Sequence, residues 1–377
     1  MKIAILGAGM VGRTMAIDLC REYDVTSFDI SKRSLDILSA KEPAVKTVVA
    51  DLGNYPDYGQ LLSGFDFVIT AVPGFMGYRT LEAVIKAGKN VADISFFPED
   101  ALTLDALAKE HNVTVITDCG VAPGMSNYII GYHNAQMKID SFECMVGGLP
   151  MKRIKPFEYK APFSPIDVIE EYTRPARLME NGRIVTKPAL SEPELTDFPE
   201  VGTLESFNTD GLRSILVTMN HIPDMKERTL RYPGHIDLIK AFMKGGFFDS
   251  KPINYKGVEI SPVEFSSALL IDQWRSEPDE EEFTIMRIKV NGTKDDALYS
   301  ITYDLFDVYD AATQMSSMSR TTGYTCTGSL RLIMNGLFIE KGVFPPELVG
   351  KHPDCFHFVM KYLEERGVVY KVTFPNP

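Results

Sequence analysis

No apolar run in this sequence of 377 residues approaches the roughly 20 residues that a helix needs to cross a bilayer. The sequence also has no basic run or stripe, and its formal net charge is −12. This acidic balance argues against nucleic acid and anionic membranes as partners, because both attract positive charge. It also means that any anionic group of a substrate must be bound by a few well-placed cations.

Cysteine is scarce and scattered along the chain. The five cysteines include no C-x-x-C pair and stand at Cys20, Cys119, Cys144, Cys326 and Cys355. We therefore expect reduced thiols in a cytoplasmic protein, with neither a disulfide framework nor a metal site. The first apolar run begins at residue 2, which leaves no room for a signal peptide before it.

The remaining composition is that of an ordinary globular protein. Hydrophobic residues make up 45% of the chain and charged residues 24%, which is enough apolar material for a sizeable core. No internal repeat or low-complexity segment is evident. The length predicts two domains.

The first thirty residues carry the clearest functional pattern. Lys2–Leu6 is a short β-prone apolar run, long enough for one buried strand. Gly7, Gly9 and Gly12 follow in G-x-G-x-x-G spacing, and the period from Met10 to Cys20 is that of a helix. In a strand–turn–helix nucleotide site the first glycine permits the tight turn and the second lets a pyrophosphate approach the backbone. The third lets the helix pack closely on the strand.

The start of the predicted helix is suited to the pyrophosphate of a dinucleotide. Its first N–H groups, which include those of Met10 and Val11, have no partner within the helix and lie at the positive end of its dipole. A strand with its own glycine loop and helix therefore predicts a dinucleotide site at this end of the chain.

The second strand of this unit predicts which dinucleotide binds. Val25–Phe28 has the character of a strand, and Asp29 ends it. A carboxylate there suits both hydroxyls of an adenosine ribose and repels a 2′-phosphate, so we expect NAD, with NADP the less favoured cofactor. The nearby cations Lys32 and Arg33 weaken that preference.

Strands and helices continue to alternate up to residue 117. The later strands are predicted at Thr47–Ala50, Asp66–Val72, Asn90–Ile94 and Val113–Thr117. Six strands with intervening helices predict an α/β fold with a doubly wound parallel sheet, the Rossmann arrangement. Ligands bind at the carboxyl ends of such strands, so two further groups of cofactor-binding residues are expected there. These are Asp51, which would lie near the adenine or else be an ordinary loop acid, and the turn of Ala71, Val72 and Pro73.

The pattern becomes mixed α and β beyond Asp118. Residues 125–337 are predicted to form a substrate domain, in which Asn181-Gly182 indicates a hairpin. Within it we expect a helix over residues 210–219 and a surface loop over residues 188–202. A last helix and the strand Val368–Thr373 predict that the chain returns to the first sheet. The nucleotide-binding domain would then be discontinuous and comprise residues 1–124 and 338–377.

An oxidoreductase also needs a charge clamp for its substrate. Arg213 and Arg231 are the best candidates, because a guanidinium group binds a carboxylate with two parallel hydrogen bonds. Tyr159 and Arg320 are further candidates for substrate contact. The alternative for each arginine is that it is an ordinary surface or structural residue without a role in substrate binding.

A proton acceptor is needed as well, and three residues qualify. His235 titrates near neutrality, and Lys160 can have a lowered pKa if it is partly shielded from water. Asp93 lies near the end of the fifth strand, at the cofactor edge. Helix capping, packing and ordinary solvation are the alternatives, and the sequence does not choose among the three candidates.

Five motifs, in order along the chain, resemble the saccharopine dehydrogenase family. They are CGVAPGM at 119–125, GGLP at 147–150, TLRYPGH at 229–235, MSRTT at 318–322 and GVFPPE at 342–347. Within the family the nearest resemblance is to the lysine 6-dehydrogenases. The resemblance implies a Rossmann domain with an inserted α+β domain, a homodimer, and oxidation at a carbon–nitrogen bond of lysine or a lysine adduct. The segment TDGLRS at 209–214 departs from the lysine enzymes, which leaves the substrate open.

We therefore expect an NAD-dependent amino-acid dehydrogenase whose partner is a small-molecule amino-acid substrate. Hydride would leave the carbon that bears the side-chain amine of lysine, and water would hydrolyse the imine. The first alternative is cleavage of saccharopine to glutamate and an aldehyde, by the same chemistry on a secondary amine. The second alternative is a sensor or scaffold that binds the cofactor without turnover.

Overall fold

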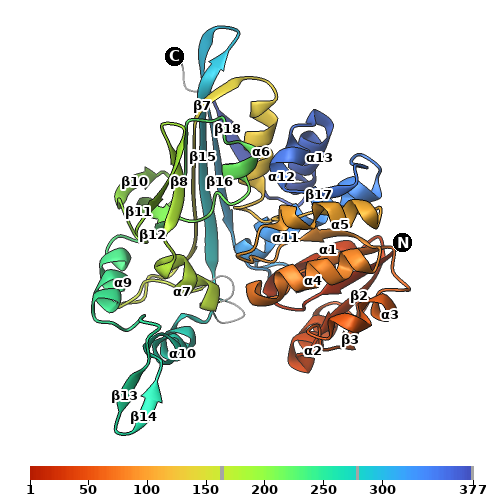
Figure 1. Ribbon diagram of the computed structural model, residues 1–377, viewed down its shortest axis with the longest axis horizontal. Helices are drawn as coiled ribbons and strands as arrows, with labels where there is room; N and C mark the ends of the chain where they lie inside the picture. Colours follow the sequence, from red (N-terminus) through yellow and green to blue (C-terminus); the bar gives the residue numbers. More distant parts are fainter. Residues whose placement is uncertain (162–164, 277–279, 375–377) are drawn as a thin grey trace. The chain divides into compact units, whose positions relative to one another are not determined.

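The computed structural model describes residues 1–161, 165–276 and 280–374. The chain divides into two compact units (Figure 1). Unit 1 comprises Met1–Ile139, Gly292–Leu298 and Met318–Tyr370, and unit 2 comprises Asp140–Asn291, Tyr299–Ser317 and the residues from Lys371 onward. This division differs from the expected ranges, 1–124 with 338–377 and 125–337. Helices α6 (Met125–Asn134) and nearly all of α11 (Ser317–Met334) belong to unit 1.

Unit 1 is built on a parallel sheet of seven strands in the order β17-β6-β5-β4-β1-β2-β3. The expected doubly wound α/β fold is therefore confirmed. Its strands are β1 Lys2–Leu6, β2 Asp24–Asp29, β3 Lys46–Val49, β4 Phe67–Thr70, β5 Asn90–Asp93, β6 Thr114–Ile116 and β17 Gly342–Phe344. Its other elements are α1 Met10–Leu19, α2 Lys32–Lys41, η1 Tyr55–Asp57, α3 Tyr58–Leu61, α4 Gly74–Lys86, η2 Ala101–Leu104, α5 Asp105–Glu110, α6, α11, α12 Pro346–Gly350 and α13 Pro353–Glu364.

Unit 2 is organised around a larger mixed sheet. The central path of this sheet runs β10-β11-β12-β7-β15-β16-β18, with β8 and β9 attached beside β12. Its strands are β7 Lys138–Pro150, β8 Ala176–Glu180, β9 Arg183–Lys187, β10 Glu194–Phe198, β11 Gly202–Thr209, β12 Asp224–Arg231, β15 Glu282–Lys294, β16 Ala297–Val308 and β18 Tyr370–Thr373. Its helices are α7 Pro165–Thr173, α8 Ile215–Thr218, α9 His235–Lys244 and α10 Pro262–Trp274.

Three expectations about the chain's path are corrected by this topology. Strand β18 belongs to the mixed sheet and not to the parallel one, so the C-terminal segment does not end in the first sheet. The strand that does return is β17, a run of three residues beside β6. The expected loop at 188–202 contains β10, and the expected helix at 210–219 is reduced to α8. The predicted hairpin is present, because β8 and β9 pair antiparallel around Asn181 and Gly182.

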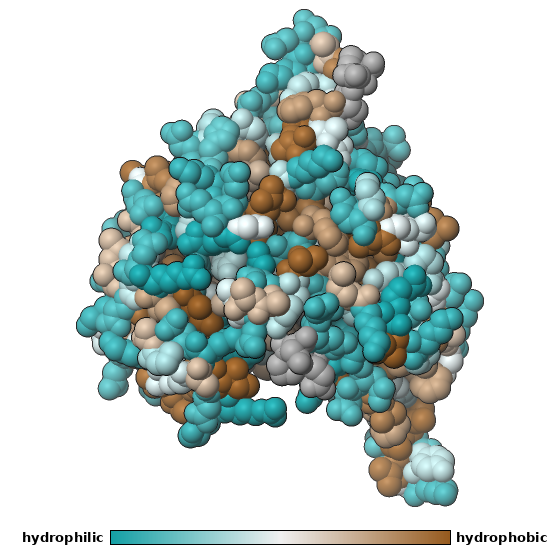
Figure 2. Space-filling model, turned by 180° about the vertical axis from the view of Figure 1, so that it is seen from behind, coloured by the Kyte–Doolittle hydropathy of each residue, from teal (hydrophilic) through white to brown (hydrophobic). Residues whose placement is uncertain are grey.

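One feature of unit 2 was not expected from the sequence. Strands β13 (Ile253–Tyr255) and β14 (Val258–Ile260) form a separate two-stranded sheet that leads into α10. This hairpin projects from unit 2, and brown, hydrophobic residues gather along it at the lower right of Figure 2. Among the described helices, none has both the length and the apolar character for crossing a bilayer.

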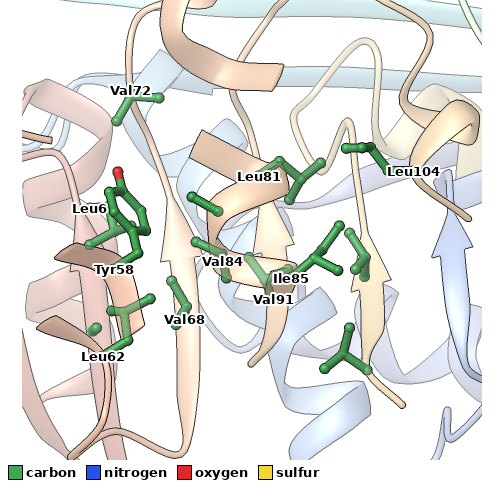
Figure 3. Close-up of a cluster of buried hydrophobic side chains, with 14 of the residues drawn as sticks. Leu6, Tyr58, Leu62, Val68, Val72, Leu81, Val84, Ile85, Val91 and Leu104 are labelled. Atoms are coloured by element: carbon green, nitrogen blue, oxygen red, sulfur yellow. The ribbon is translucent and has the colours of Figure 1, made fainter. Parts of the chain in front are cut away.

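The core of unit 1 lies between the sheet and its helices. Buried side chains of β1, β4 and β5 pack against those of α4 and the segment before β4 (Figure 3). These include Leu6, Val68, Val91, Leu81 and Val84, all without solvent exposure. Because the strands are buried on both faces, they read as short continuous apolar runs, which is why the sequence predicted them well.

Candidate functional site

The glycine loop joins β1, α1 and the turn after β4 in direct contact. Gly7 has a φ of +116°, and a Cβ on it would lie 2.3 Å from the carbonyl oxygen of Ala71. A Cβ on Gly12 would lie 2.1 Å from the carbonyl oxygen of Gly7. Both contacts are with backbone, which cannot move aside as a side chain can. The first and third glycines are therefore required by the fold itself.

Gly9 is different, and its surroundings test whether the loop fits a dinucleotide. A Cβ built on Gly9 meets nothing within 4 Å, and its φ of −65° is open to any residue. Gly9 is the N-cap residue of α1 and makes no side-chain hydrogen bond to the helix. The first N–H groups of the helix, from Met10 and Val11 onward, are therefore not capped by a side chain of this residue. This open space beside a helix start fits a pyrophosphate.

Asp29, at the end of β2, is hydrogen-bonded to the glycine loop. Its Oδ2 accepts a hydrogen bond from the backbone N–H of Ala8 at 2.6 Å, and its Oδ1 accepts one from that of Ser31 at 2.7 Å. The carboxylate is half-buried and can accept further bonds, since each oxygen has two lone pairs. Asp51, at the end of β3, is exposed and accepts from the N–H of Gly53 at 2.9 Å.

The turn after β4 and the end of β5 complete this edge of the sheet. The N–H of Ala71 donates to the carbonyl of Leu6 at 2.8 Å, and Val72 and Pro73 lead into α4. Asp93 ends β5 and has no exposed surface. Its Oδ1 accepts from the Thr70 hydroxyl at 2.6 Å and from the N–H of Ser95 at 3.1 Å.

The second oxygen of Asp93 differs from the first in its hydrogen bonding. Within the described part of the chain, Oδ2 of Asp93 is buried and has no hydrogen-bond partner. Burial raises the pKa of Asp93 to about 7, and the negative charge of Asp118 adds to this effect although Thr70 and Ser95 oppose it. A buried carboxyl group that titrates near neutrality and lacks one partner can take up or release a proton.

Unit 2 brings three of the predicted residues together around Arg231. The guanidinium group is only 2% exposed and lies 4.5 Å from the centre of the Tyr159 ring. Its Nε donates to the Tyr172 hydroxyl at 2.9 Å and its Nη2 to Oε2 of Glu171 at 2.8 Å. Arg231 therefore already has an anionic partner, which a substrate carboxylate would have to displace.

His235 belongs to the same cluster and is held in one tautomer. Its Nδ1 lies 2.9 Å from the carbonyl oxygen of Phe157, which can only accept, so Nδ1 carries the proton. Its Nε2, 2.9 Å from the Tyr172 oxygen, then accepts from that hydroxyl. Burial and, to a smaller extent, the charge of Arg231 together lower the pKa of His235 to about 3. This arrangement favours a structural role for His235 and opposes its role as proton acceptor.

The other predicted residues lie outside this cluster. The ammonium group of Lys160 lies 3.2 Å from the carbonyl oxygen of Gln273 and 3.0 Å from that of Arg275, at the end of α10. Arg213 is half-buried in the turn before α8, with a φ of +48°. Arg320 lies in the first turn of α11, in unit 1, and donates to the carbonyl of Arg366 at 3.2 Å.

Two partners in the Arg231 cluster were missed from the sequence. Glu171 and Tyr172 stand in α7, about sixty positions before Arg231, and α7 itself was not predicted. Their adjacency offered one usable signal, because an acid beside a tyrosine can serve a buried arginine. In the described part of the chain, no three His, Cys, Asp or Glu side chains gather as a metal site.

The cluster geometry separates the two candidate clamp arginines experimentally. We expect Arg231→Ala to lower the free energy of unfolding by about 3 kcal/mol, because Glu171 and two tyrosine hydroxyls lose a buried partner. We expect Arg213→Ala to lower that free energy less, because Arg213 is only half-buried, and to raise the KM for an amino-acid substrate about tenfold, or about 1.4 kcal/mol. Denaturant titration measures the free energy of unfolding, and steady-state kinetics measure the KM. A stable Arg231→Ala protein with a raised KM would assign the clamp to Arg231 instead.

The fold and the glycine loop define a class of protein. A doubly wound sheet with an open, uncapped helix start and an acid ending β2 is a dinucleotide-binding unit, joined here to a second α+β unit. The chain belongs to the saccharopine dehydrogenase family: residues 3–116 match the saccharopine dehydrogenase NADP binding domain, and residues 118–368 match the saccharopine dehydrogenase C-terminal domain.

Individual relatives are similar at low identity. The saccharopine dehydrogenase [NADP(+), L-glutamate-forming] of Schizosaccharomyces pombe is 24% identical over an alignment 424 residues long, gaps included, which covers 91% of this chain and 93% of the relative. The mitochondrial alpha-aminoadipic semialdehyde synthase of Rattus norvegicus is 24% identical over 309 residues, covering 77% of this chain and 33% of the relative. The chain thus spans about a third of the length of that synthase.

Solved structures support the fold. Apo saccharopine dehydrogenase (L-Glu forming) from Saccharomyces cerevisiae matches with a TM-score of 0.81 and 19% identity, covering 100% of both chains. Homospermidine synthase from Legionella pneumophila, solved in complex with NAD, matches with a TM-score of 0.66 and 12% identity, covering 99% of this chain and 91% of the other.

Proposed function

We propose that this protein oxidises the secondary amine of saccharopine and releases L-glutamate and an aldehyde. The observation that carries the proposal is the match to the S. pombe saccharopine dehydrogenase over 91% of this chain and 93% of that relative. The sequence alone favoured lysine as the substrate, and the names of these relatives favour the saccharopine alternative. Lysine oxidation is therefore the second candidate.

The proposed reaction removes two electrons, as a hydride, from the C–H bond beside the substrate nitrogen. A nicotinamide dinucleotide held by the glycine loop and Asp29 would supply the acceptor for a hydride that leaves the carbon next to the secondary amine. The nitrogen lone pair closes the C=N bond, and water then adds to the carbon and expels glutamate. The balance is saccharopine, oxidised dinucleotide and water on one side, and glutamate, aldehyde, reduced dinucleotide and one proton on the other. The amine must be neutral at the start, since an ammonium group has no lone pair.

We assign the proton from the substrate amine to Asp93. Of the three candidates for proton acceptor, Lys160 is engaged with backbone carbonyls and His235 is neutral with both ring nitrogens bonded. Asp93 has a pKa of about 7 and a buried oxygen that lacks a partner in the described chain. It ends β5, at the edge of the sheet where the glycine loop lies.

A cofactor-reduction assay tests the proposed function. The purified protein is mixed with NAD or NADP and with saccharopine, lysine or neither, and absorbance of the reduced nicotinamide is followed together with glutamate. Saccharopine should give reduced cofactor and glutamate in equal amounts. Reduction with lysine alone would establish the second candidate. Tight dinucleotide binding without reduction by any amine would indicate a sensor and overturn both.

We further propose that NAD is the preferred cofactor, although the matching family domain and the S. pombe relative are both named for NADP. The half-buried carboxylate of Asp29 supports this preference, because it places negative charge where a 2′-phosphate would bind. Lys32 does not offset it fully, since its ammonium group pairs with Asp36 at 2.8 Å.

Substitution of Asp29 should therefore change the cofactor preference. We expect Asp29→Ser to reduce the NAD/NADP ratio of kcat/KM at least about tenfold, or about 1.4 kcal/mol. Asp29→Asn is the matched variant, because it removes the charge and keeps an acceptor for the N–H of Ala8 or Ser31. Kinetics with both cofactors measure the ratio. If the unmodified protein had a higher kcat/KM with NADP than with NAD, Asp29 would not be the residue that selects the cofactor.

A further inference from the structure

Arg13, in the first turns of α1, is bonded to the glycine loop. Its side chain is half-buried, and its Nη1 donates a hydrogen bond to the carbonyl oxygen of Ala8 at 2.8 Å. The backbone N–H of the same residue, Ala8, donates to Oδ2 of Asp29 at 2.6 Å. Arg13 and Asp29 therefore bind the two polar backbone groups of one loop residue, and a cation and an anion lie side by side at the glycine loop.

The positive charge of Arg13 is not neutralised by a bonded acid. Burial lowers the pKa of Arg13, whereas the negative charge of Asp29 acts in the opposite direction, so the two groups feel each other. Within residues 1–161, 165–276 and 280–374, however, no ion pair joins Arg13 to Asp29 or to another acid, and its bonded partner is the Ala8 carbonyl. Burial also lowers the pKa of Lys41, and the charge of Arg13 adds to this effect. An anion beside Arg13 would relieve this excess of positive charge.

The other cations that follow β2 are less suited to hold an anion at the loop. The ammonium group of Lys32 is paired within α2. Arg33 is exposed, and no printed contact of the described chain holds its side chain against the glycine loop. Lys41 stands at the end of α2 that is remote from Asp29. Arg13 is thus the cation whose position at the loop is fixed by a hydrogen bond.

NAD and NADP differ in one group of the adenosine ribose, where NADP carries a 2′-phosphate in place of a hydroxyl. In dinucleotide-binding units an acid at the end of the second strand binds the ribose hydroxyl, and a nearby arginine accommodates the 2′-phosphate. A guanidinium group matches a phosphate with parallel hydrogen bonds. This chain has an acid and an arginine bound to the same loop residue, so both kinds of recognition are available to it.

We propose that Arg13 binds the 2′-phosphate of NADP and so determines how well this protein accepts NADP beside NAD. The proposal rests on the dinucleotide site at the glycine loop and on the selection by Asp29 proposed above. Asp29 favours the ribose hydroxyls of NAD and repels a phosphate, and Arg13 offsets that repulsion. When NAD is bound, Arg13 keeps its bond to the Ala8 carbonyl and contributes little to affinity.

Calorimetry with two half-cofactors tests the proposal on the full chain. Adenosine 5′-monophosphate and adenosine 2′,5′-bisphosphate differ only in the 2′-phosphate, and neither contains nicotinamide, so the result is independent of which amine the protein oxidises. We expect Arg13→Gln to raise the dissociation constant of the bisphosphate at least about tenfold, or about 1.4 kcal/mol, and to leave that of the monophosphate nearly unchanged. Arg13→Lys should lose part of this affinity, because an ammonium group lacks the planar fork.

Two further variants separate a direct contact from a general effect of charge. Arg21→Gln removes an exposed arginine just after α1 and should change neither dissociation constant. In the Asp29→Asn background, the selective effect of Arg13→Gln should persist, because a bonded phosphate does not need Asp29. Both Arg13 variants retain a donor for the Ala8 carbonyl, so their unfolding midpoints should stay close to that of the parent.

Four results would overturn the proposal. The parent could fail to bind the bisphosphate, or Arg13→Gln could weaken both half-cofactors equally, which would indicate a structural role. The selective loss could also disappear in the Asp29→Asn background, which would show that Arg13 only screens Asp29. Finally, Arg33→Gln could cause the selective loss that Arg13→Gln does not, which would assign the phosphate to Arg33.

Discussion

Gly9→Ala should strongly weaken dinucleotide binding without lowering the free energy of unfolding. No atom lies within 4 Å of a Cβ on Gly9, and its backbone conformation suits alanine, so the free energy of unfolding should be unchanged or slightly higher. The methyl group would occupy the space that a pyrophosphate needs at the start of α1. We expect the dissociation constant for NAD to rise at least about 100-fold, or about 2.8 kcal/mol. Isothermal calorimetry and denaturant titration measure the two quantities.

Gly12→Ala is the matched variant with the opposite expectation. Its Cβ would lie 2.1 Å from the backbone oxygen of Gly7, so β1 and α1 would have to separate. The free energy of unfolding should fall by about 1–3 kcal/mol or more, which is the cost of overpacking in a well-packed region. If Gly9→Ala bound NAD as the parent does, the dinucleotide would not bind in this loop, and the cofactor site would need to be reassigned.

The contrast between the two glycines shows what the sequence could and could not provide. Spacing alone identified Gly7, Gly9 and Gly12, because the motif is local and each strand of unit 1 is a short apolar run. It could not say that Gly7 and Gly12 are required by backbone contacts within the chain while Gly9 is free of them. For Gly7 that distinction depends on Ala71, which reaches the loop only through the folded sheet, and for Gly12 it depends on the backbone oxygen of Gly7.

Longer-range features were the ones that sequence reasoning missed. Strand β17 has three residues and gains its identity only from pairing with β6, more than two hundred positions earlier. Strand β18 looked like the end of the first sheet because a helix precedes it, but its pairing partner is β16. The choice between two sheets depends on tertiary contacts, and neither propensity nor period records them.

The substrate residues were limited in the same way. Arg231 and His235 were selected for their chemistry, and the structure does place them together with Tyr159. Their hydrogen bonds, however, go to Tyr172 and Glu171 of α7 and to the Phe157 carbonyl. Residue type shows what a side chain can do, while burial and partners decide whether it remains available for a substrate.

Asp93→Asn should remove the proton acceptor and flatten the pH dependence of the reaction. If ionised Asp93 takes the proton of the substrate amine, kcat for amine oxidation rises with pH through about 7, the pKa that burial gives this carboxyl group. Asparagine cannot take up that proton, so kcat should fall at least about 100-fold, the lower end for general acid–base catalysis. The rise near pH 7 should disappear with it. Glu110→Gln, at an exposed carboxylate that ends α5, is the control and should keep the parent profile.

Stability provides a second measurement that does not depend on turnover. The pKa of Asp93 rises from the model-compound value of 3.8 to about 7 on folding, so the folded protein holds a proton that the unfolded chain has released. The favourable contribution of protonated Asp93 is therefore complete below about pH 4 and is lost as the pH rises through about 7. Its full size is of the order of 4 kcal/mol. Relative to Asp93→Asn, the parent should lose stability over this interval in denaturant titrations. Equal pH dependence of unfolding in both proteins would show that Asp93 does not titrate there, and the proton acceptor would have to be sought elsewhere.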